Sequence, residues 1–349
     1  MTTLFTLENT RIAKFGDIPK PKIIKSSLVP DIKSQVNILT ARQTVTNILN
    51  GYDPRKLVIV GPCSIHDTQA AMDYACQLNK LRILYNKKLF IIMRTYMDKP
   101  RTQVGWKGFI NDPRLDGTHH IYEGLFKSRE LLLQINNLGL PVATEWLDTI
   151  TPQYISDLVT IGMIGARTTE SQVHRQLISG MSMPVGFKNN MSGNVQVACD
   201  AMVVAAHPQS FLGTTDEGEI ALINTRGNED TFLVLRGSQQ GTNYDADSIA
   251  DAVETLKSSA VKPAIIIDCS HGNSRKDYKN QSYVCTSVAN QIATGNKIIK
   301  GVMIESNLHE GNQKLSDTPL KYGVSITDGC VNLQTTEELM QYLADRVDL

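Results

Sequence analysis

The stretch LVIVGPCSIHD (residues 57–67) runs an apolar segment into a Gly-Pro turn, followed at once by a cysteine, a serine, a histidine and an aspartate. A short apolar run that ends at such a turn is typical of a buried β-strand. Cys63 therefore stands directly after a strand. Free cysteine is often only a small buried hydrophobe, so a structural and a chemical role for Cys63 are both open at this point.

Seven more runs of this kind follow along the chain. They are LFIIMR (89–94), PVATEW (141–146), MIGAR (163–167), PVGFK (184–188), TFLVLR (231–236), AIIIDCS (264–270) and KGVMIE (300–305). Between most of them lie segments with apolar residues at three- and four-residue spacing, which favours amphipathic helices. Uniformly apolar strands that alternate with helices indicate a parallel sheet covered on its faces. Eight such units predict an α/β fold, a (β/α)8 TIM barrel.

Two segments do not fit the eightfold pattern. Residues 1–45 show no clear periodicity and predict an N-terminal extension for oligomer contact or regulation, which leaves residues 46–349 for the catalytic barrel. Two apolar runs around TTDEGE predict an inserted β-hairpin at about 209–225. Structural padding is an equally open interpretation of both additions.

Composition narrows the class of protein. With 41% hydrophobic and 20% charged residues, the 349-residue chain has the make-up of a soluble globular protein. Its 35 basic residues balance its 35 acidic residues, which disfavours a nucleic-acid or anionic-membrane partner. The six cysteines lack CxxC spacing, and we find no signal peptide or membrane-spanning run. These features predict a cytoplasmic protein.

The residues at the predicted strand ends are chemically reactive or charged. In a barrel all these ends face one mouth, and here they bring together Cys63, Arg94, Glu145, Arg167, Lys188, Arg236, His271 and Glu305. The cations, joined by Lys99 and Arg101, would suit phosphate and carboxylate groups. The thiol, imidazole and carboxylate, with Asp328 after the last strand, are ligand types for a divalent metal. A solvated edge is the alternative, because strand ends are often polar simply where they reach water. None of the candidate metal ligands belongs to a short ligand motif.

Longer motifs point to a family. They are GPCSIHD, KPRTQVGWKG, INDPRLDG, GARTTESQVHR, PVGFKN, LRG, DCSHGNS, IESNLHEGNQ and YGVSITDGC. From about Asn47 to its C-terminus, the chain resembles the class I 3-deoxy-D-arabino-heptulosonate 7-phosphate (DAHP) synthases of the bacterial, aromatic-amino-acid-regulated type. The resemblance implies a transferase that condenses phosphoenolpyruvate with D-erythrose 4-phosphate and water, to give DAHP and phosphate. This is the first step of the shikimate pathway to chorismate and the aromatic amino acids.

The resemblance also implies roles for individual residues. The metal, which is Mn, Fe, Co or Zn, would be held by Cys63, His271, Glu305 and Asp328. Phosphoenolpyruvate would be bound by Arg94, Lys99, Ala166, Arg167, Lys188 and Arg236, with erythrose 4-phosphate at Arg101 and Thr102. Lys99 is the candidate proton donor to the nascent alkoxide. Glu145 or His271 would manage the water.

Feedback regulation is implied as well. An aromatic amino acid would bind at Trp146, Asp148, Gln153, Leu177, Met181, Ser182, Phe211 and Ile223, beneath a neighbouring subunit's N-terminal tail. Ordinary packing is the alternative interpretation of these positions. The segments HGNSRKDY and IESNLHEGNQ favour tyrosine over phenylalanine as the inhibitor. Additions outside a barrel predict a homodimer or homotetramer.

Two other functions remain as alternatives. A 3-deoxy-D-manno-octulosonate 8-phosphate synthase would act on arabinose 5-phosphate, but that family has a KxNRS-like segment where this chain has KPRT (99–102). A non-catalytic sensor of phosphorylated metabolites would need a broken metal or anion set, and here the set is intact. Two departures from the DAHP synthase pattern, YMD before Lys99 and KNNMSGN from Lys188 onward, bear on rates and loop geometry.

Overall fold

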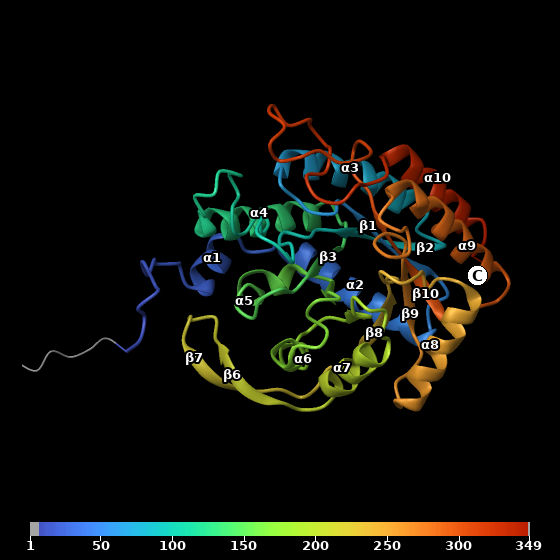
Figure 1. The fold of residues 1–349 in the computed structure, drawn as a ribbon, viewed down its shortest axis with the longest axis horizontal. Coiled ribbons are helices and arrows are strands. Elements are labelled where there is room, and N and C mark those ends of the chain that lie inside the picture. Colours follow the sequence, from blue (N-terminus) through green and yellow to red (C-terminus); the bar gives the residue numbers. More distant parts are fainter. Residues whose placement is uncertain (1–6, 348–349) are drawn as a thin grey trace, which may run out of the picture.

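The computed structural model of the protein describes residues 7–347. Eight parallel strands close into a barrel in the order β1-β10-β9-β8-β5-β4-β3-β2 (Figure 1). They are β1 (Lys56–Gly61), β2 (Leu89–Arg94), β3 (Val142–Glu145), β4 (Ile161–Ile164), β5 (Val185–Lys188), β8 (Thr231–Leu235), β9 (Ile265–Asp268) and β10 (Ile299–Glu305). The TIM barrel and its eight strands are confirmed. Strand β4 ends earlier than predicted because the chain turns at Gly165, whose carbonyl accepts hydrogen bonds from the amides of Thr168 and Thr169.

Helices follow the strands around the barrel. They are α3 (Thr68–Leu84), α4 (Ile121–Asn137), α5 (Pro152–Ile155), η1 (Ser156–Leu158), α6 (Gln172–Ile178), α7 (Gln196–Ala206), α8 (Ala246–Ser258), η2 (Tyr278–Asn280), α9 (Gln281–Ala293) and α10 (Leu333–Ala344). The aspartate of the opening stretch begins the first of them. The Asp67 carboxylate accepts hydrogen bonds from the amides of Gln69 and Ala70 and so caps α3.

Alternation along each strand divides the core into two parts. In β1, Val58 and Val60 pack outward with the helices, whereas Leu57 and Ile59 pack inside the barrel with residues such as Met303. Both faces are buried, which explains why the strands read as continuous apolar runs. The barrel interior is therefore a packed core, and polar chemistry is confined to its ends.

The N-terminal segment is more regular than its sequence suggested. It contains α1 (Pro21–Ser27) and α2 (Ile32–Asn50), although its sequence shows no clear periodic pattern. The predicted boundary near residue 46 falls inside α2, and Val45 and Ile48 of this helix join the interior core cluster. Helix α2 is thus part of the barrel's packing. Residues 1–6 of the predicted extension, and 348–349 of the predicted barrel, lie outside the described part.

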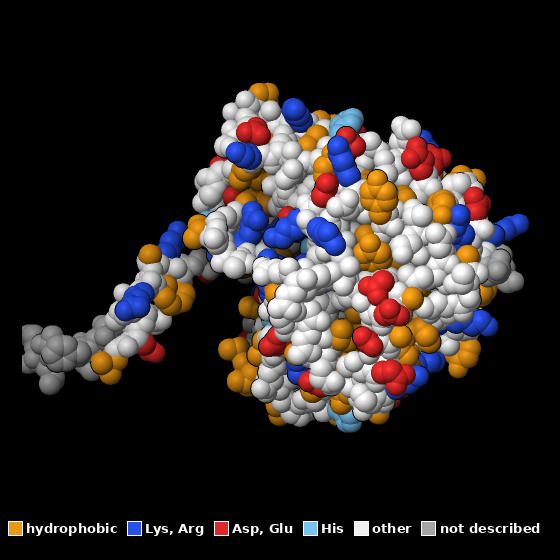
Figure 2. All heavy atoms as spheres, turned by 45° about the vertical axis from the view of Figure 1, so that its right-hand side comes forward, with side chains coloured by type: hydrophobic (Ala, Val, Ile, Leu, Met, Phe, Trp, Pro, Cys, Tyr) orange, Lys and Arg blue, Asp and Glu red, His pale blue; other side chains and the backbone are white. Residues whose placement is uncertain are grey.

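The inserted hairpin lies within its predicted range. Strands β6 (Ser210–Thr214) and β7 (Ile220–Asn224) pair antiparallel between α7 and β8. Ion pairs join the hairpin tip to the N-terminal segment: Lys20 to Glu219 at 2.8 Å and Lys25 to Asp216 at 2.9 Å. The first described residues, from Leu7 onward, project away from the body, as Figures 1 and 2 show. Among the helices of residues 7–347, we find none with the length and apolarity to cross a membrane.

Candidate active site

The carboxyl ends of the barrel strands surround a cavity of about 390 Å³. Ten of the sequence-predicted site residues line it: Arg94, Lys99, Arg101, Glu145, Ala166, Arg167, Lys188, Arg236, His271 and Asp328. Cys63 and Glu305 are fully buried beside the cavity and do not line it. The side chain of Thr102 accepts a hydrogen bond from Arg167. The structure therefore gathers the predicted residues from all eight strands at one mouth.

Arg94 is a buried cation held on every side. Its guanidinium donates to the carbonyls of Pro62 and Cys63 at 3.1 and 3.2 Å and to Glu305 at 2.9 Å, and it stacks over the ring of Tyr96. The charges of Arg94 and Glu305 neutralise each other in a buried ion pair. Arg94 therefore fixes the end of β10 as well as presenting charge to the cavity.

Glu305 is the centre of a dense carboxylate network. Its second oxygen accepts a hydrogen bond of 2.7 Å from Ser270, and Nε2 of His271 lies 3.7 Å from its first oxygen. Burial opposes ionisation of Glu305, but His271, Arg94 and Lys99 outweigh it and lower the pKa to about 2. Glu305 is thus an anion at neutral pH.

The thiol of Cys63 faces a cation. Nζ of Lys99 lies 3.0 Å from its Sγ and 3.3 Å from its carbonyl oxygen. Burial raises the pKa of the Cys63 thiol to about 11, Glu305 adds to this effect and Lys99 opposes it. The lysine is therefore placed to accompany a thiolate, which is the form that binds metals.

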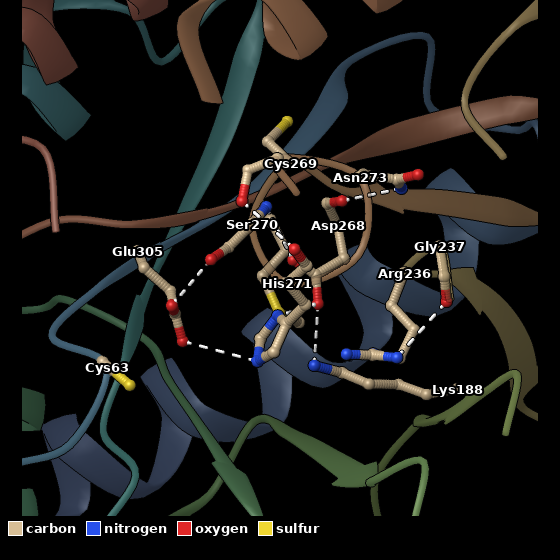
Figure 3. A network of polar contacts seen from close by, with 12 residues as sticks. Cys63, Lys188, Arg236, Gly237, Asp268, Cys269, Ser270, His271, Asn273 and Glu305 are labelled. Carbon is tan, nitrogen blue, oxygen red and sulfur yellow. Dashed lines mark hydrogen bonds and ion pairs between the residues drawn. The ribbon is translucent and has the colours of Figure 1, made fainter. Parts of the chain in front are cut away.

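Asp268 links two of the predicted residues (Figure 3). One of its oxygens accepts a hydrogen bond of 2.8 Å from Nζ of Lys188 and lies 2.9 Å from Nδ1 of His271. Burial would raise the pKa of Asp268, but His271 and Lys188 hold it well below its usual range. The carboxylate therefore orients Lys188 by a hydrogen bond, whereas it only approaches Nδ1 of His271, which has no hydrogen-bond partner among the described residues. It leaves Nε2 of His271 on the side of Glu305.

The donor set fits a divalent metal. Ligand atoms of Cys63, Glu305 and Asp328 lie within 4.8 Å of one another. His271 adjoins this group through Glu305, and its Nδ1 lies 2.9 Å from a carboxylate oxygen of Asp268. A carboxylate beside the second ring nitrogen is common at metal-binding histidines, where it accepts a hydrogen bond from that nitrogen. Thiolate, imidazole and carboxylate together suit a transition metal of the first row better than Mg or Ca.

The cations at the outer rim are less paired than those inside. Within residues 7–347, the buried guanidinium of Arg236 donates only to the carbonyl of Gly237, while the guanidinium of Arg167 is exposed and donates to Thr102. Arg101 is exposed, and its guanidinium donates to the carbonyl of Trp106. These guanidinium groups keep donors free for an anion.

The side chain of Glu145 requires a glycine at position 165. It ends β3, is largely buried and lines the cavity. A β-carbon on Gly165 would stand 2.0 Å from an oxygen of Glu145. Only glycine leaves the carboxylate its place at the start of the GARTT segment.

Sequence reasoning missed several residues of this site. Asp268, Ser270 and Tyr96 orient predicted residues, and Asn189 accepts the amide hydrogen of Arg236 at 2.9 Å. Asp268 carried a usable signal, because it is the last residue of an apolar strand in DCSHGNS. The others became visible only once the strands were set side by side.

A second and larger cavity lies between α1, α2, α6 and the β6–β7 hairpin. Its volume is about 1100 Å³, and six of the eight predicted regulatory residues line it: Gln153, Leu177, Met181, Ser182, Phe211 and Ile223. Trp146 and Asp148 do not. Trp146 is buried in the core, and Asp148 accepts hydrogen bonds from the amides of Ile150 and Thr151, which shapes the segment leading to the cavity.

Comparisons with known proteins match these findings. The sequence profile of the DAHP synthetase I family matches residues 32–341. The chain belongs to this family. The phenylalanine-inhibited phospho-2-dehydro-3-deoxyheptonate aldolase of Saccharomyces cerevisiae is 46% identical, over 98% of this chain and 94% of that protein. The Tyr-sensitive enzyme of Escherichia coli is 44% identical, over 96% and 94%. A solved phospho-2-dehydro-3-deoxyheptonate aldolase from Francisella tularensis superposes with a TM-score of 0.95 at 45% identity, covering 96% of this chain and 98% of that one.

Proposed function

We propose that this protein is a DAHP synthase, which joins phosphoenolpyruvate to D-erythrose 4-phosphate with water and releases inorganic phosphate. The observation that carries the proposal is the single mouth in which ten predicted residues meet, in a chain of the DAHP synthetase I family. A decayed sensor would have lost part of this set. Arabinose 5-phosphate remains the substrate to exclude, and the KPRT segment argues against it.

Phosphoenolpyruvate would lie across the cavity with its charges on separate cations. Arg167 and Arg236 would bind its phosphate, with the backbone of Ala166, because their guanidinium donors are free at the rim. Its carboxylate would meet Lys188 and Lys99, deeper in the mouth near Arg94. Two anionic substrates repel each other in water. Separate cations for each anionic group would reduce this repulsion and fix the orientation of the substrates.

Erythrose 4-phosphate would enter by the KPRT segment. Arg101 is exposed at the cavity edge, and Thr102 is tied to Arg167 by a hydrogen bond of 3.1 Å. Both could hold the sugar phosphate while the aldehyde points toward Cys63 and Asp328. A divalent ion held by Cys63, His271, Glu305 and Asp328 would supply Lewis acidity at the aldehyde.

The chain's own groups would then manage the protons. C3 of phosphoenolpyruvate forms a bond to the aldehyde carbon, and Lys99 would give a proton to the resulting alkoxide. Water adds at C2, with Glu145 or His271 as the base that takes its proton. The C2 hydroxyl then loses its proton and becomes the ketone as the bond between C2 and the phosphate oxygen breaks, and phosphate leaves with that oxygen and the electron pair of the broken bond.

Regulation by an aromatic amino acid would use the 1100 Å³ cavity. Apolar residues such as Leu177 and Phe211 would pack on the ring, while Gln153 and Ser182 could meet polar groups. We favour tyrosine over phenylalanine on the two sequence segments named above. We further propose a homodimer or homotetramer in which a neighbour's N-terminal tail closes this cavity. We also propose that the protein is cytoplasmic, and its six cysteines are free thiols.

Phosphate release tests the proposal directly. Chelator-stripped protein should release phosphate only when phosphoenolpyruvate, erythrose 4-phosphate and Mn(II) are all present. Arabinose 5-phosphate should not replace the four-carbon sugar, and 1 mM tyrosine, far above a micromolar affinity, should inhibit. Turnover with arabinose 5-phosphate, or none with either sugar, would contradict the proposal.

A further inference from the structure

A third cavity of about 380 Å³ adjoins the catalytic mouth, and Arg236 is its one described lining residue that takes part in the steps above. Its lining includes Met191, Arg236, Ser238, Gly272, Arg275 and Lys276. We call it the side cavity. Met191, Arg236 and Lys276 also line the catalytic cavity, so the two spaces share a wall. We propose that the side cavity is an anion subsite that receives inorganic phosphate after its release from phosphoenolpyruvate, which makes it dependent on the proposed function.

The first argument is charge. Three of the lining residues are cations, Arg236, Arg275 and Lys276, and the rest are polar, glycine or methionine. Within residues 7–347, no carboxylate belongs to the lining, and none of the three cations forms a salt bridge. Unpaired cations on a concave wall focus a positive potential and attract an anion.

The second argument is rigidity. The walls come from the loops after β8 and β9, which touch backbone to backbone: a β-carbon on Gly272 would lie 2.4 Å from the amide nitrogen of Ser238. The Ser238 hydroxyl accepts hydrogen bonds from the amides of Gln240 and Gly241 and closes a tight turn. A preformed wall needs little ordering when a small anion binds.

The third argument is backbone strain. Arg275 and Lys276 are consecutive residues in the left-handed region, with φ of 53° and 62°. Each such residue costs about 1 kcal/mol or more, and glycine or asparagine would hold the same conformation at lower cost. Two long cations at strained positions therefore point to a role for their side chains. Hydrogen bonds of 3.0 and 2.9 Å, from the amides of Arg275 and Lys276 to the carbonyls of Gly272 and His271, keep the loop in this form.

The position of the side cavity identifies the anion. Cleavage of the bond between C2 and oxygen leaves inorganic phosphate, with that oxygen, beside Arg167 and Arg236. Because Arg236 belongs to both cavities, the phosphate can exchange onto Arg275 and Lys276 without crossing an uncharged surface. The phosphate of erythrose 4-phosphate is assigned to Arg101 and Thr102, neither of which lines the side cavity.

The test is a titration of inorganic phosphate into chelator-stripped protein that is saturated with phosphoenolpyruvate, measured by calorimetry. The catalytic phosphate position is then filled, and no turnover occurs without metal and sugar. We compare wild type, Arg101→Ala and the double variant Arg275→Asn/Lys276→Asn, since asparagine tolerates the left-handed region. Phosphate should still bind to Arg101→Ala and should bind at least tenfold more weakly to the double variant.

Steady-state kinetics supply a second measurement. Phosphate should inhibit wild type in a way that saturating phosphoenolpyruvate does not relieve, and the double variant should lose this component. Lys279→Ala is the matched control, because it removes a nearby exposed lysine that does not line the side cavity. Its phosphate affinity should equal that of wild type.

Three results would overturn the proposal. One is phosphate affinity that is unchanged in the double variant, and another is affinity lost in Arg101→Ala. The third is a higher KM for erythrose 4-phosphate in the double variant with unchanged phosphate inhibition, which would assign the cavity to the sugar phosphate. Absence of turnover in wild type is a separate outcome that contradicts the proposed function, and the calorimetric titration still decides whether the subsite binds phosphate.

Discussion

Replacing Asp268 by asparagine should destabilise the protein severely, although asparagine has nearly the same shape. Asp268 is fully buried and pairs with Lys188 at 2.8 Å, and the lysine side chain is only 5% exposed. Removing one partner of a buried ion pair leaves the other charge uncompensated, at a cost of about 3–5 kcal/mol. Domains are stable by only about 5–15 kcal/mol, so Asp268→Asn should lose a large part of the total.

Urea unfolding of chelator-stripped protein measures this loss as a lower midpoint at unchanged slope. The double variant Asp268→Asn/Lys188→Met removes both charges and should recover more than 1 kcal/mol relative to the single variant. Activity should not return, because Lys188 is also the proposed contact for the substrate carboxylate. Glu254→Gln, which breaks the exposed pair with Lys257, is the control and should change stability by less than about 1 kcal/mol. A single variant as stable as wild type, or a double variant that is the sum of its parts, would refute this reasoning.

Three further predictions concern other parts of the molecule. Cys63→Ala should lower the affinity for Mn(II) at least tenfold in equilibrium dialysis, since a ligand atom is lost; unchanged affinity would remove the thiol from the site. Burial, aided by Asp148, raises the pKa of Asp98 to about 7, so the folded state binds this proton more tightly than the unfolded state and stability falls as pH rises from about 4 to 7. Asp98→Asn should therefore stabilise the protein at pH 8 but not at pH 4, by at most about 4 kcal/mol, and equal denaturation midpoints at pH 8 would contradict this. Ser182→Trp fills the predicted regulatory cavity from an exposed position, so inhibition by tyrosine should weaken at least tenfold with kcat within about twofold of wild type; unaltered inhibition would place the effector elsewhere.

The barrel could be predicted from sequence because its strands are buried on both faces. Runs such as LFIIMR (89–94) carry the signal within themselves, and β2 has those bounds. The role of α2 could not be predicted in this way. Helix α2 contacts the barrel interior through Val45 and Ile48. The position of a helix before the first strand in the sequence does not show which end of the barrel it covers.

For the site too, the sequence predicts some features and not others. Reading the last residue of each strand was enough to find the cations and ligand types, because parallel strands bring their carboxyl ends to one mouth. That reading does not show which side chains pair. The Lys188–Asp268 bond spans 80 residues and the Arg94–Glu305 bond spans 211. The positive φ of His271 and Lys276 likewise depends on how the loop after β9 packs.

The pairing explains how a neutral chain can crowd so many cations at one mouth. Arg94 and Lys188 are each neutralised by a buried carboxylate, whereas exposed Arg167 and buried Arg236 have no such partner among the residues that the structure describes. The charges of Arg167 and Arg236 are therefore uncompensated, and the positive potential is concentrated on their side of the cavity. Dianionic phosphates should therefore be held at the rim, and the singly charged carboxylate and the aldehyde should reach the deeper, paired region. This ordering places the bond-forming carbons beside Cys63 and keeps departing phosphate on the outer cations, from which the way to solvent is shortest.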